Sequence, residues 1–387
     1  MGVRTTDGTD VHSSAPWTRL LAAAGVVAAV VALVGSPASA CNAAGQTWSP
    51  FVLVAGLLLV GVVAEGDGLF HAAGTQLARV ARNGVALFAG GALLIVVVTA
   101  TLNLDTSVVF LTPVLIAAAR QRDEGERPLL YGSLFLANAS SLYLPGSNLT
   151  NLIVLGHHPL SGSAFLALMW PAAVAASVVT TCCIGVWARR DVAASSTPVL
   201  AAERPSWGLG ALAVVLAVVL VLVLRSPAGP VLLVGVFALA VRVGQRRTSA
   251  SGAVHSLGVP VLVGLFGITI GLGTLGRTWS GPAELLSHVG GVGSAIISAV
   301  ASVLFNNLPA ASLLAARSPH HASDLLVGLN LGPNLFASGS LAWFLWFTVA
   351  RSSGAEPSLR QASRLGIIVV PLSMAAALAA LALAGSG

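Results

Sequence analysis

The chain has 387 residues, of which 56% are hydrophobic and only 8% are charged. Soluble domains carry about 25% charged residues, so this composition excludes a soluble globular protein. The formal net charge is +6, but every basic residue is an arginine, and the arginines are scattered in short segments between apolar runs. This distribution argues against a nucleic-acid-binding surface, and we expect no nucleic-acid partner.

Long apolar runs recur along the chain and predict membrane-spanning helices. A helix needs about 20 apolar residues to cross the hydrocarbon core, where only helices and closed barrels satisfy the backbone. The runs lack the period-two alternation of barrel strands. We therefore predict an all-α integral membrane protein, a polytopic helical bundle within a lipid bilayer. The runs are 20–40, 85–100, 165–188, 209–224, 231–241 and 365–384.

The first run has two interpretations. Arg19, the apolar residues 20–34 and the small residues before Cys41 are similar to a secretory signal peptide. However, Ala38 is a poor lipobox residue, and a polytopic protein needs no cleavable leader. We expect a retained first helix.

The arginines predict the orientation of the bundle. If residues 1–19 form a cytoplasmic tail and the chain then crosses at each apolar run, the segment 41–50 lies outside and carries no arginine. Sixteen of the nineteen arginines then lie inside, and only Arg225, Arg277 and Arg317 lie outside. This bias agrees with the positive-inside rule. We expect a multi-pass protein of the cytoplasmic membrane with a cytoplasmic N-terminus.

Two apolar stretches are interrupted by a few polar residues and return to the side from which they came. The stretch 84–119 is broken at 103–106 and is followed by cytoplasmic arginines. The stretch 288–316 is broken at 306–309 and ends at Arg317 on the outer side. We predict two re-entrant hairpins that enter the membrane from opposite faces.

Each hairpin precedes a crossing segment rich in Gly, Asn, Ser and Pro. Residues 136–149 can be aligned with 328–341, which pairs Asn138 with Asn330. The two segments cross in opposite directions, so we predict two inverted-topology repeats, each with a re-entrant hairpin and a broken transmembrane helix, around a mid-membrane site. Packing alone would explain Gly and Pro in one such helix, whereas two segments in matching order favour a transport site. The expected divisions are a tail at 1–19, the first repeat at 20–190, connecting segments at 191–254 and the second repeat at 255–387.

Four motifs in these segments occur in a recognisable order. They are Asp105-Thr-Ser-Val-Val-Phe-Leu-Thr-Pro113, Ser147-Asn-Leu-Thr-Asn151, Phe305-Asn-Asn-Leu-Pro-Ala310 and Gly328-Leu-Asn-Leu-Gly-Pro-Asn334. Together they resemble the arsenite efflux permeases of the ion transporter superfamily, which also contains dicarboxylate, citrate and sodium–proton carriers. The resemblance covers roughly residues 50 to 380 and implies a secondary transporter.

Asp105 is the acidic residue that lies deep within an apolar run. An Asp at that depth costs about 2.5–3.5 kcal/mol on insertion scales, which favours a functional role. Burial favours the neutral form of a carboxyl group, so we predict that Asp105 binds and releases a coupling proton. Alternatively, it caps the returning half-helix through the amides of Thr106 and Ser107. The two roles can coexist.

Hydroxyl and amide side chains near the interruptions are predicted to bind the solute, because broken helices leave backbone groups that need polar partners. Arsenite at neutral pH is an uncharged trihydroxide, which such groups can bind without an arginine. No arginine lies within the apolar segments, and this disfavours an anionic substrate. The predicted solute-binding residues are Asn103, Thr106, Asn138, Ser147, Asn148, Thr150, Asn306, Asn307, Asn330, Ser338 and Ser340.

The leading prediction is proton-coupled export of arsenite or antimonite. A carboxylate or inorganic-anion carrier, or a sodium–proton antiporter, is the alternative, and sodium could then replace the proton. The sequence has no Walker-type glycine loop, and no nucleophile–base pair or metal cluster at usable spacing. We therefore expect no enzyme activity, cofactor or metal. The resemblance allows two kinds of protein partner. One is a separate ATPase subunit, which some arsenite permeases recruit, and the other is a second copy of this chain in a homodimer.

Other features have simpler interpretations. Glu65 and Asp67 are expected at the membrane interface, with a place on a proton path as the alternative. Trp343 and Trp346 are expected in an interfacial aromatic belt. The histidine pairs at 157–158 and 320–321 are expected in external turns rather than in a metal site.

Overall fold

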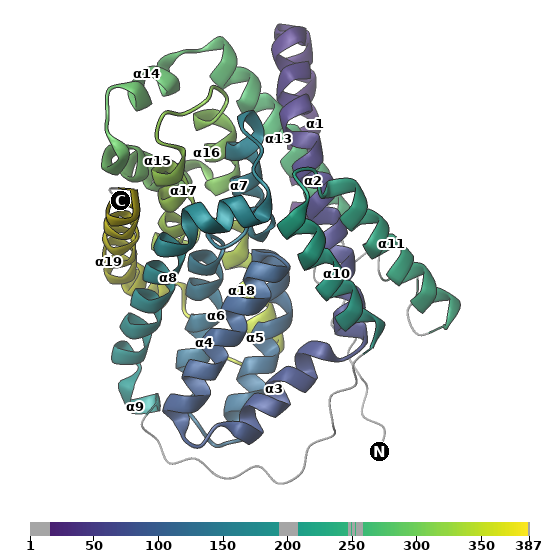
Figure 1. Cartoon of the computed structure of the whole chain (residues 1–387), viewed down its shortest axis with the longest axis vertical. Helices are drawn as coiled ribbons and strands as arrows, with labels where there is room; N and C mark the ends of the chain where they lie inside the picture. The colour runs from purple at the N-terminus through teal and green to yellow at the C-terminus, as the bar shows by residue number, and fades with distance from the viewer. Residues whose placement is uncertain (1–15, 193–207, 247–248, 250–251, 253–257, 386–387) are drawn as a thin grey trace.

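The computed structural model describes residues 16–192, 208–246, 249, 252 and 258–385, and all regular structure within these ranges is helical (Figure 1). Some apolar helices have only 10–17 residues: α10 (Leu209–Val223), α11 (Ala228–Gly244) and α15 (Gly291–Phe305). The prediction of an all-α integral membrane protein is confirmed. The helices long and apolar enough to cross a membrane are α1 (Pro16–Gly35), α2 (Pro37–Gly66), α4 (Gly84–Thr101), α8 (Gly162–Trp187), α13 (Val259–Thr278) and α19 (Leu359–Gly385).

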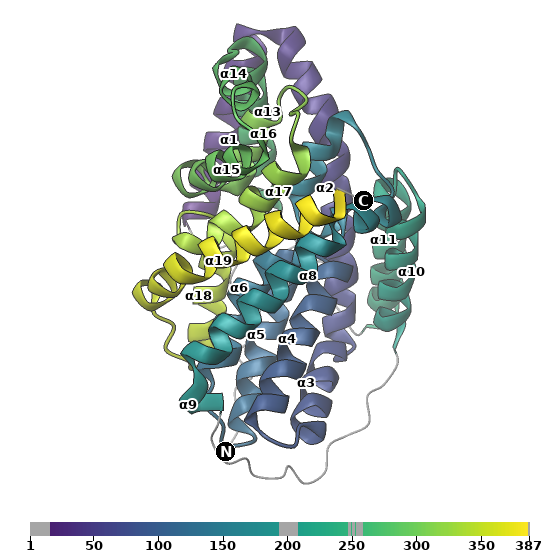
Figure 2. The ribbon, with the colours of Figure 1, turned by 60° about the vertical axis from the view of Figure 1, so that its left-hand side comes forward.

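Two halves of the chain repeat one order of elements: a long helix, a short helix, a two-helix hairpin, a broken helix and a long final helix. The first half consists of α2, α3 (Leu69–Val80), the hairpin α4–α5 (Leu104–Arg120), the broken helix α6 (Arg127–Ser140), η1 (Pro145–Ser147) and α7 (Leu149–Val154), and α8. The second half consists of α13, α14 (Gly281–Ser287), the hairpin α15–α16 (Asn307–Leu314), the broken helix α17 (Ala322–Leu331), η3 (Gly332–Leu335) and α18 (Leu341–Ser352), and α19. Figure 2 shows α8 and α19 side by side, and the two helices pack against each other.

The two hairpins enter the bundle from opposite ends. The first opens beside α3 and α9 (Arg189–Val192), and the second opens toward α14 at the other end of the molecule (Figure 1). α4 ends at Thr101 and α5 begins at Leu104, while Asn306 alone separates α15 from α16. Both predicted interruptions and the inverted topology are therefore confirmed.

Four helices form a framework beside the hairpins: α1, α2, α11 and α13. In it α1 packs on α13 and α11 packs on α2, so the helix that precedes each half contacts the long first helix of the other half. Glycines allow these close approaches, as small residues do in membrane helices. A methyl group on Gly267 would lie 2.1 Å from the carbonyl oxygen of Gly25, and one on Gly56 would lie 2.7 Å from the amide nitrogen of Leu232.

The segment 41–50, which is expected on the outer side, is helical and belongs to the first part of α2. The turn falls at Ser36, and Pro37 begins the next helix at the position where its missing N–H costs nothing. With 30 residues, α2 is about 45 Å long, so it extends well beyond a hydrocarbon core of about 30 Å.

The expectation for two tryptophans is wrong. Trp343 and Trp346 are not in an interfacial belt: they are 1% and 0% exposed. Their indole N–H groups donate to the carbonyls of Pro333 at 2.8 Å and Leu130 at 2.7 Å. The side chain of Asp67, at the end of α2, is 6% exposed and forms an ion pair of 2.6 Å with Arg242 of α11.

Candidate solute-binding site

A small cavity lies where four half-helices begin. Its volume is about 60 Å³. The amino ends of α5, α7, α16 and α18 reach it, and α2 and α13 of the framework close one side. Both hairpin tips and both helix breaks therefore meet at one place. The lining residues are Val54, Asn103, Leu104, Asp105, Ser147, Asn148, Leu149, Leu262, Leu265, Asn306, Asn307, Leu308, Ser340, Leu341 and Ala342.

Each half-helix has a polar residue at its N-cap. The first amides of a helix have no partner within it and carry partial positive charge, so an N-cap oxygen stabilises the start of the helix. Three of the caps are asparagines, and the fourth is Ser340. The side-chain oxygens of Asn103, Asn148 and Asn306 accept from the amides of Thr106, Thr150 and Leu308 at 2.7, 3.2 and 3.5 Å, respectively.

Several buried polar atoms at this site have no hydrogen-bond partner within the described part of the chain. They are Nδ2 of Asn103, Oγ1 of Thr106 and Oγ of Ser340. A buried polar group without a partner costs about 1–3 kcal/mol. Nδ2 of Asn103 and Oγ of Ser340 belong to residues that line the cavity, so a bound solute with hydroxyl groups could satisfy them.

Asp105 lies at the second position of α5 and lines the cavity. It is the acidic side chain among the lining residues, and no arginine is among them. Within the described ranges, its carboxylate has no ion-pair partner. The site therefore presents one ionisable group surrounded by neutral amides, hydroxyls and leucines.

A network of asparagines joins the two broken helices behind the cavity. Asn330 accepts from Nδ2 of Asn148 at 2.8 Å and donates to Oδ1 of Asn151 at 2.8 Å. Nδ2 of Asn138 donates to Oδ1 of Asn334 at 2.9 Å. Asn138 and Asn330 are 0% exposed and do not line the cavity, so their contacts indicate a structural role in holding the two breaks together.

Matching serines tie each hairpin to the broken helix of its own half. The hydroxyl of Ser147 donates to the carbonyl of Ala100 near the end of α4, at 3.1 Å. The hydroxyl of Ser338 donates to the carbonyl of Val303 near the end of α15, at 2.7 Å. Ser147 is fully buried and lines the cavity, whereas Ser338 is exposed.

The structure brings seven of the predicted residues together at the cavity: Asn103, Asp105, Ser147, Asn148, Asn306, Asn307 and Ser340. Thr106, Asn138, Thr150, Asn330 and Ser338 do not line it. The leucines of the first helical turns were missed. A signal for them exists in the sequence, because a polar residue followed by leucine recurs at Asn103-Leu104, Asn148-Leu149, Asn307-Leu308 and Ser340-Leu341.

Inverted repeats whose half-helices meet at a central cavity define a helical membrane transporter. The comparisons with known proteins agree. The family model described as citrate transporter, CitMHS, matches residues 12–348, and the chain belongs to this family.

Curated relatives extend this assignment over nearly the whole chain. An arsenical pump membrane protein of Yersinia enterocolitica is 26% identical over 95% of this chain and 93% of its own length. One of Escherichia coli strain K12 is 26% identical over 93% of this chain and 92% of its own length. These relatives confirm the predicted resemblance to the arsenite permeases of the ion transporter superfamily. They are membrane transport proteins, in agreement with a function other than catalysis.

A solved structure supports the fold. The crystal structure of the Alcanivorax borkumensis YdaH transporter, described as having an unusual topology, matches with a TM-score of 0.52 at 18% sequence identity. The match covers 89% of this chain and 87% of that chain. At this identity the likeness concerns the arrangement of the helices alone.

Proposed function

We propose that this protein exports a small, neutral, hydroxylated solute, arsenite or antimonite, in exchange for protons. The observation that carries this proposal is the size and chemistry of the cavity. A buried water needs about 10–15 Å³ of such volume, so the cavity of about 60 Å³ has room for a few groups of that size. A trihydroxide of arsenic matches this size, whereas a tricarboxylate is considerably larger.

The polar groups of the cavity suit a solute that both donates and accepts hydrogen bonds. Amide groups of Asn103 and Asn307 and the hydroxyl of Ser340 can do both, and the helix amino ends add N–H donors. The absence of arginine among the lining residues favours a neutral solute over an anion. The name of the curated relatives supports the same choice.

Asp105 is the proposed proton carrier. A carboxylate at the amino end of a helix is stabilised when ionised, whereas a low-dielectric cavity favours the neutral form. The helix therefore stabilises the ionised form of Asp105, and the cavity stabilises its neutral form. Because Asp105 lines the solute cavity, proton and solute binding can affect each other directly, as an antiporter requires.

The proposed orientation places the end with α3 and α9 in the cytoplasm. Arg79, Arg120 and Arg189 belong to elements at that end. Arg277 lies in the last turn of α13, and Arg225 and Arg317 follow α10 and α16, on the side toward α14. By the positive-inside rule, the arginine-poor α14 end faces outward, and the chain begins on the cytoplasmic side.

Transport into everted membrane vesicles tests the proposal. We expect arsenite uptake that depends on an imposed proton gradient and stops when a protonophore collapses it. Citrate uptake, or sodium-dependent proton movement without arsenite uptake, would instead support the alternative carriers. Vesicles from cells that lack the protein provide the background.

A further inference from the structure

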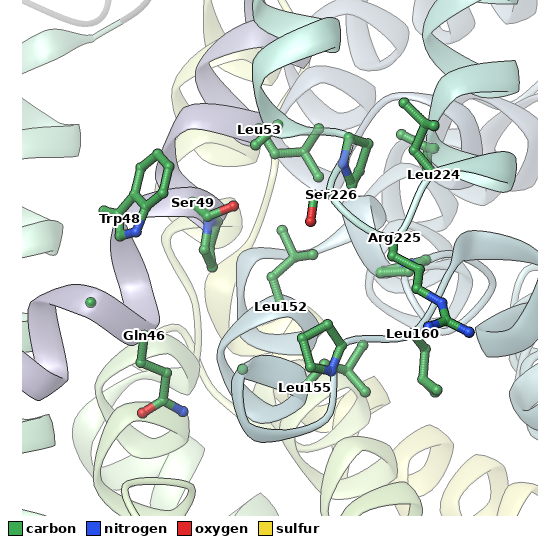
Figure 3. A pocket seen from close by; sticks show the side chains of 18 residues that line it. Gln46, Trp48, Ser49, Leu53, Leu152, Leu155, Leu160, Leu224, Arg225 and Ser226 are labelled. Atoms are coloured by element: carbon green, nitrogen blue, oxygen red, sulfur yellow. The ribbon is translucent and has the colours of Figure 1, made fainter.

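A second, larger cavity of about 290 Å³ lies on the side of the solute cavity that faces the arginine-poor end. It is lined by residues 45–53 of α2, by η1 and α7, and by the turn between α10 and α11 (Figure 3). Its residues include Gln46, Ser49, Leu53, Pro145 and Ser226. Neither the proposed solute site nor the proposed proton carrier lies in this cavity.

The two cavities are lined by neighbouring residues of the same elements. Leu53 lines the larger cavity, and the next residue, Val54, lines the solute cavity. Pro145 likewise lines the larger cavity, and Ser147 of the same 3₁₀ turn lines the solute cavity. A methyl group on Gly146 would lie 3.7 Å from Leu53, so this turn packs against the same leucine. Leu53 and Pro145 are thus the barrier between the cavities.

Gln46 connects the larger cavity to the half-helices that form the site. Its side-chain amide donates to the carbonyl of Ile153 at the end of α7, at 3.0 Å, and to that of Ala315 after α16, at 3.3 Å. Arg277 of α13 donates to the side-chain oxygen of Gln46. Two half-helices that begin at the solute cavity therefore end at a residue that lines the larger one.

Polar side chains line part of this cavity, among apolar ones. Figure 3 shows Ser49, Ser226 and Arg225 among the leucines of this cavity. Arg225 is its charged residue, and no acidic residue lines it. Because a single arginine without a counter-charge repels cations, the cavity suits a neutral or anionic solute in water.

From these observations we infer that the larger cavity is the outer vestibule of the transport path. The neutral hydroxylated solute leaves through it, and Leu53 and Pro145 close it in this conformation. The inference rests on the proposed function, because it requires that a solute crosses the protein.

Cysteine labelling tests the vestibule. In a background with Cys41, Cys182 and Cys183 replaced by alanine, Ser226→Cys is treated from outside the cell with charged, membrane-impermeant methanethiosulfonates. We expect severalfold loss of arsenite efflux after reaction, and an anionic reagent that reacts roughly threefold faster than a cationic one. Adding Arg225→Gln should remove this preference.

Ser163→Cys is the matched control, because Ser163 is exposed and lies outside the cavity. This variant should react without loss of efflux. Complete labelling of Ser226→Cys with unchanged efflux would overturn the inference.

A second measurement does not depend on the identity of the solute. Leu53→Ala should increase the rate at which an external reagent reaches Ser147→Cys severalfold, whereas Val52→Ala on the same helix should not. Equal rates in the two variants would overturn the barrier. If Leu53→Ala opens the path but the unmodified protein moves no arsenite, the proposed solute is wrong and the vestibule stands.

Discussion

The two hairpin tips share an architecture and differ in chemistry. Each tip places an asparagine at the N-cap of a half-helix that begins at the solute cavity. At the first tip, Asn103 has an extended backbone with φ −168°, and Asp105 lies two residues after it. At the second tip, Asn306 has φ 74°, and the neutral Asn307 follows. The comparison indicates that a symmetric scaffold can hold an asymmetric site, with one tip for proton exchange and one with fixed hydrogen-bonding groups.

The opposite ends of the hairpins show the same kind of difference. Each hairpin begins with a glycine that faces a carboxylate: a methyl group on Gly84 would lie 2.6 Å from Oε2 of Glu124, and one on Gly291 would lie 2.5 Å from Oδ2 of Asp324. Glu124 is 8% exposed, whereas the side chain of Asp324 is 25% exposed and lies 3.8 Å from His321. Again the first hairpin carries the more buried acid.

Replacing the acid at the first tip should have the largest effect on transport. Asp105→Asn keeps the size of the side chain but removes the exchangeable proton. We expect proton-driven arsenite uptake in everted vesicles to fall to the level of vesicles without the protein, at unchanged protein amount and melting temperature. Asp324→Asn, outside the cavity, should transport normally. Uptake by Asp105→Asn that still follows the proton gradient would contradict the proposed asymmetry.

The backbone at the second tip should make its stability unusually sensitive to substitution. A φ of 74° at Asn306 suits glycine better than alanine, and such backbone strain costs about 1–3 kcal/mol. We expect Asn306→Ala to be less stable than Asn306→Gly by an amount in this range, as measured by thermal unfolding in detergent.

At the first tip, the corresponding pair should show no such preference for glycine. The extended backbone of Asn103 accommodates alanine, and both substitutions mainly remove the cap bond, which is worth about 1 kcal/mol. If Asn103→Gly rescued stability as well as Asn306→Gly, backbone strain would not distinguish the tips.

The two serine ties should differ less. Ser147→Ala leaves the carbonyl of Ala100 without its partner in a partly buried place, which costs about 1–3 kcal/mol. Ser338→Ala removes an exposed bond, whose net contribution is about 0.5–1.5 kcal/mol because water can replace it. Unfolding of the two variants side by side measures the difference, and a larger loss for Ser338→Ala would refute this ranking.

The smallest expected effect concerns Glu124 in the turn after α5. Burial raises the pKa of this carboxyl, and the charge of Arg122 partly opposes the increase. The folded protein therefore binds this proton more tightly than the unfolded chain does, so stability should decrease as pH rises from the ordinary pKa through the raised one. Glu124→Gln should lack this decrease when melting temperature is followed against pH, whereas Asp324→Asn should retain it. A pH profile shared by wild type and Glu124→Gln would exclude the effect.

Much of the architecture could be predicted from local sequence. Apolar length set the crossing helices, and short polar interruptions located both hairpin tips within a few residues. The inverted order followed from the arginines, because the cost of moving them across lipid orients a chain before it packs. The division into repeats at 20–190 and 255–387, the roles of the site residues and the cytoplasmic N-terminus remain predictions.

Tertiary packing decided which polar residues face the solute. Asn138 and Asn148 belong to the same polar segment, yet Asn148 lines the cavity and Asn138 binds Asn334 behind it. Likewise, Trp343 and Trp346 are typical interfacial residues by sequence, but neighbouring helices enclose them. The physical reason is that every polar group within lipid needs a partner. The sequence by itself determined that such groups are present, whereas only the arrangement of the helices determined whether the partner is another helix or the solute cavity.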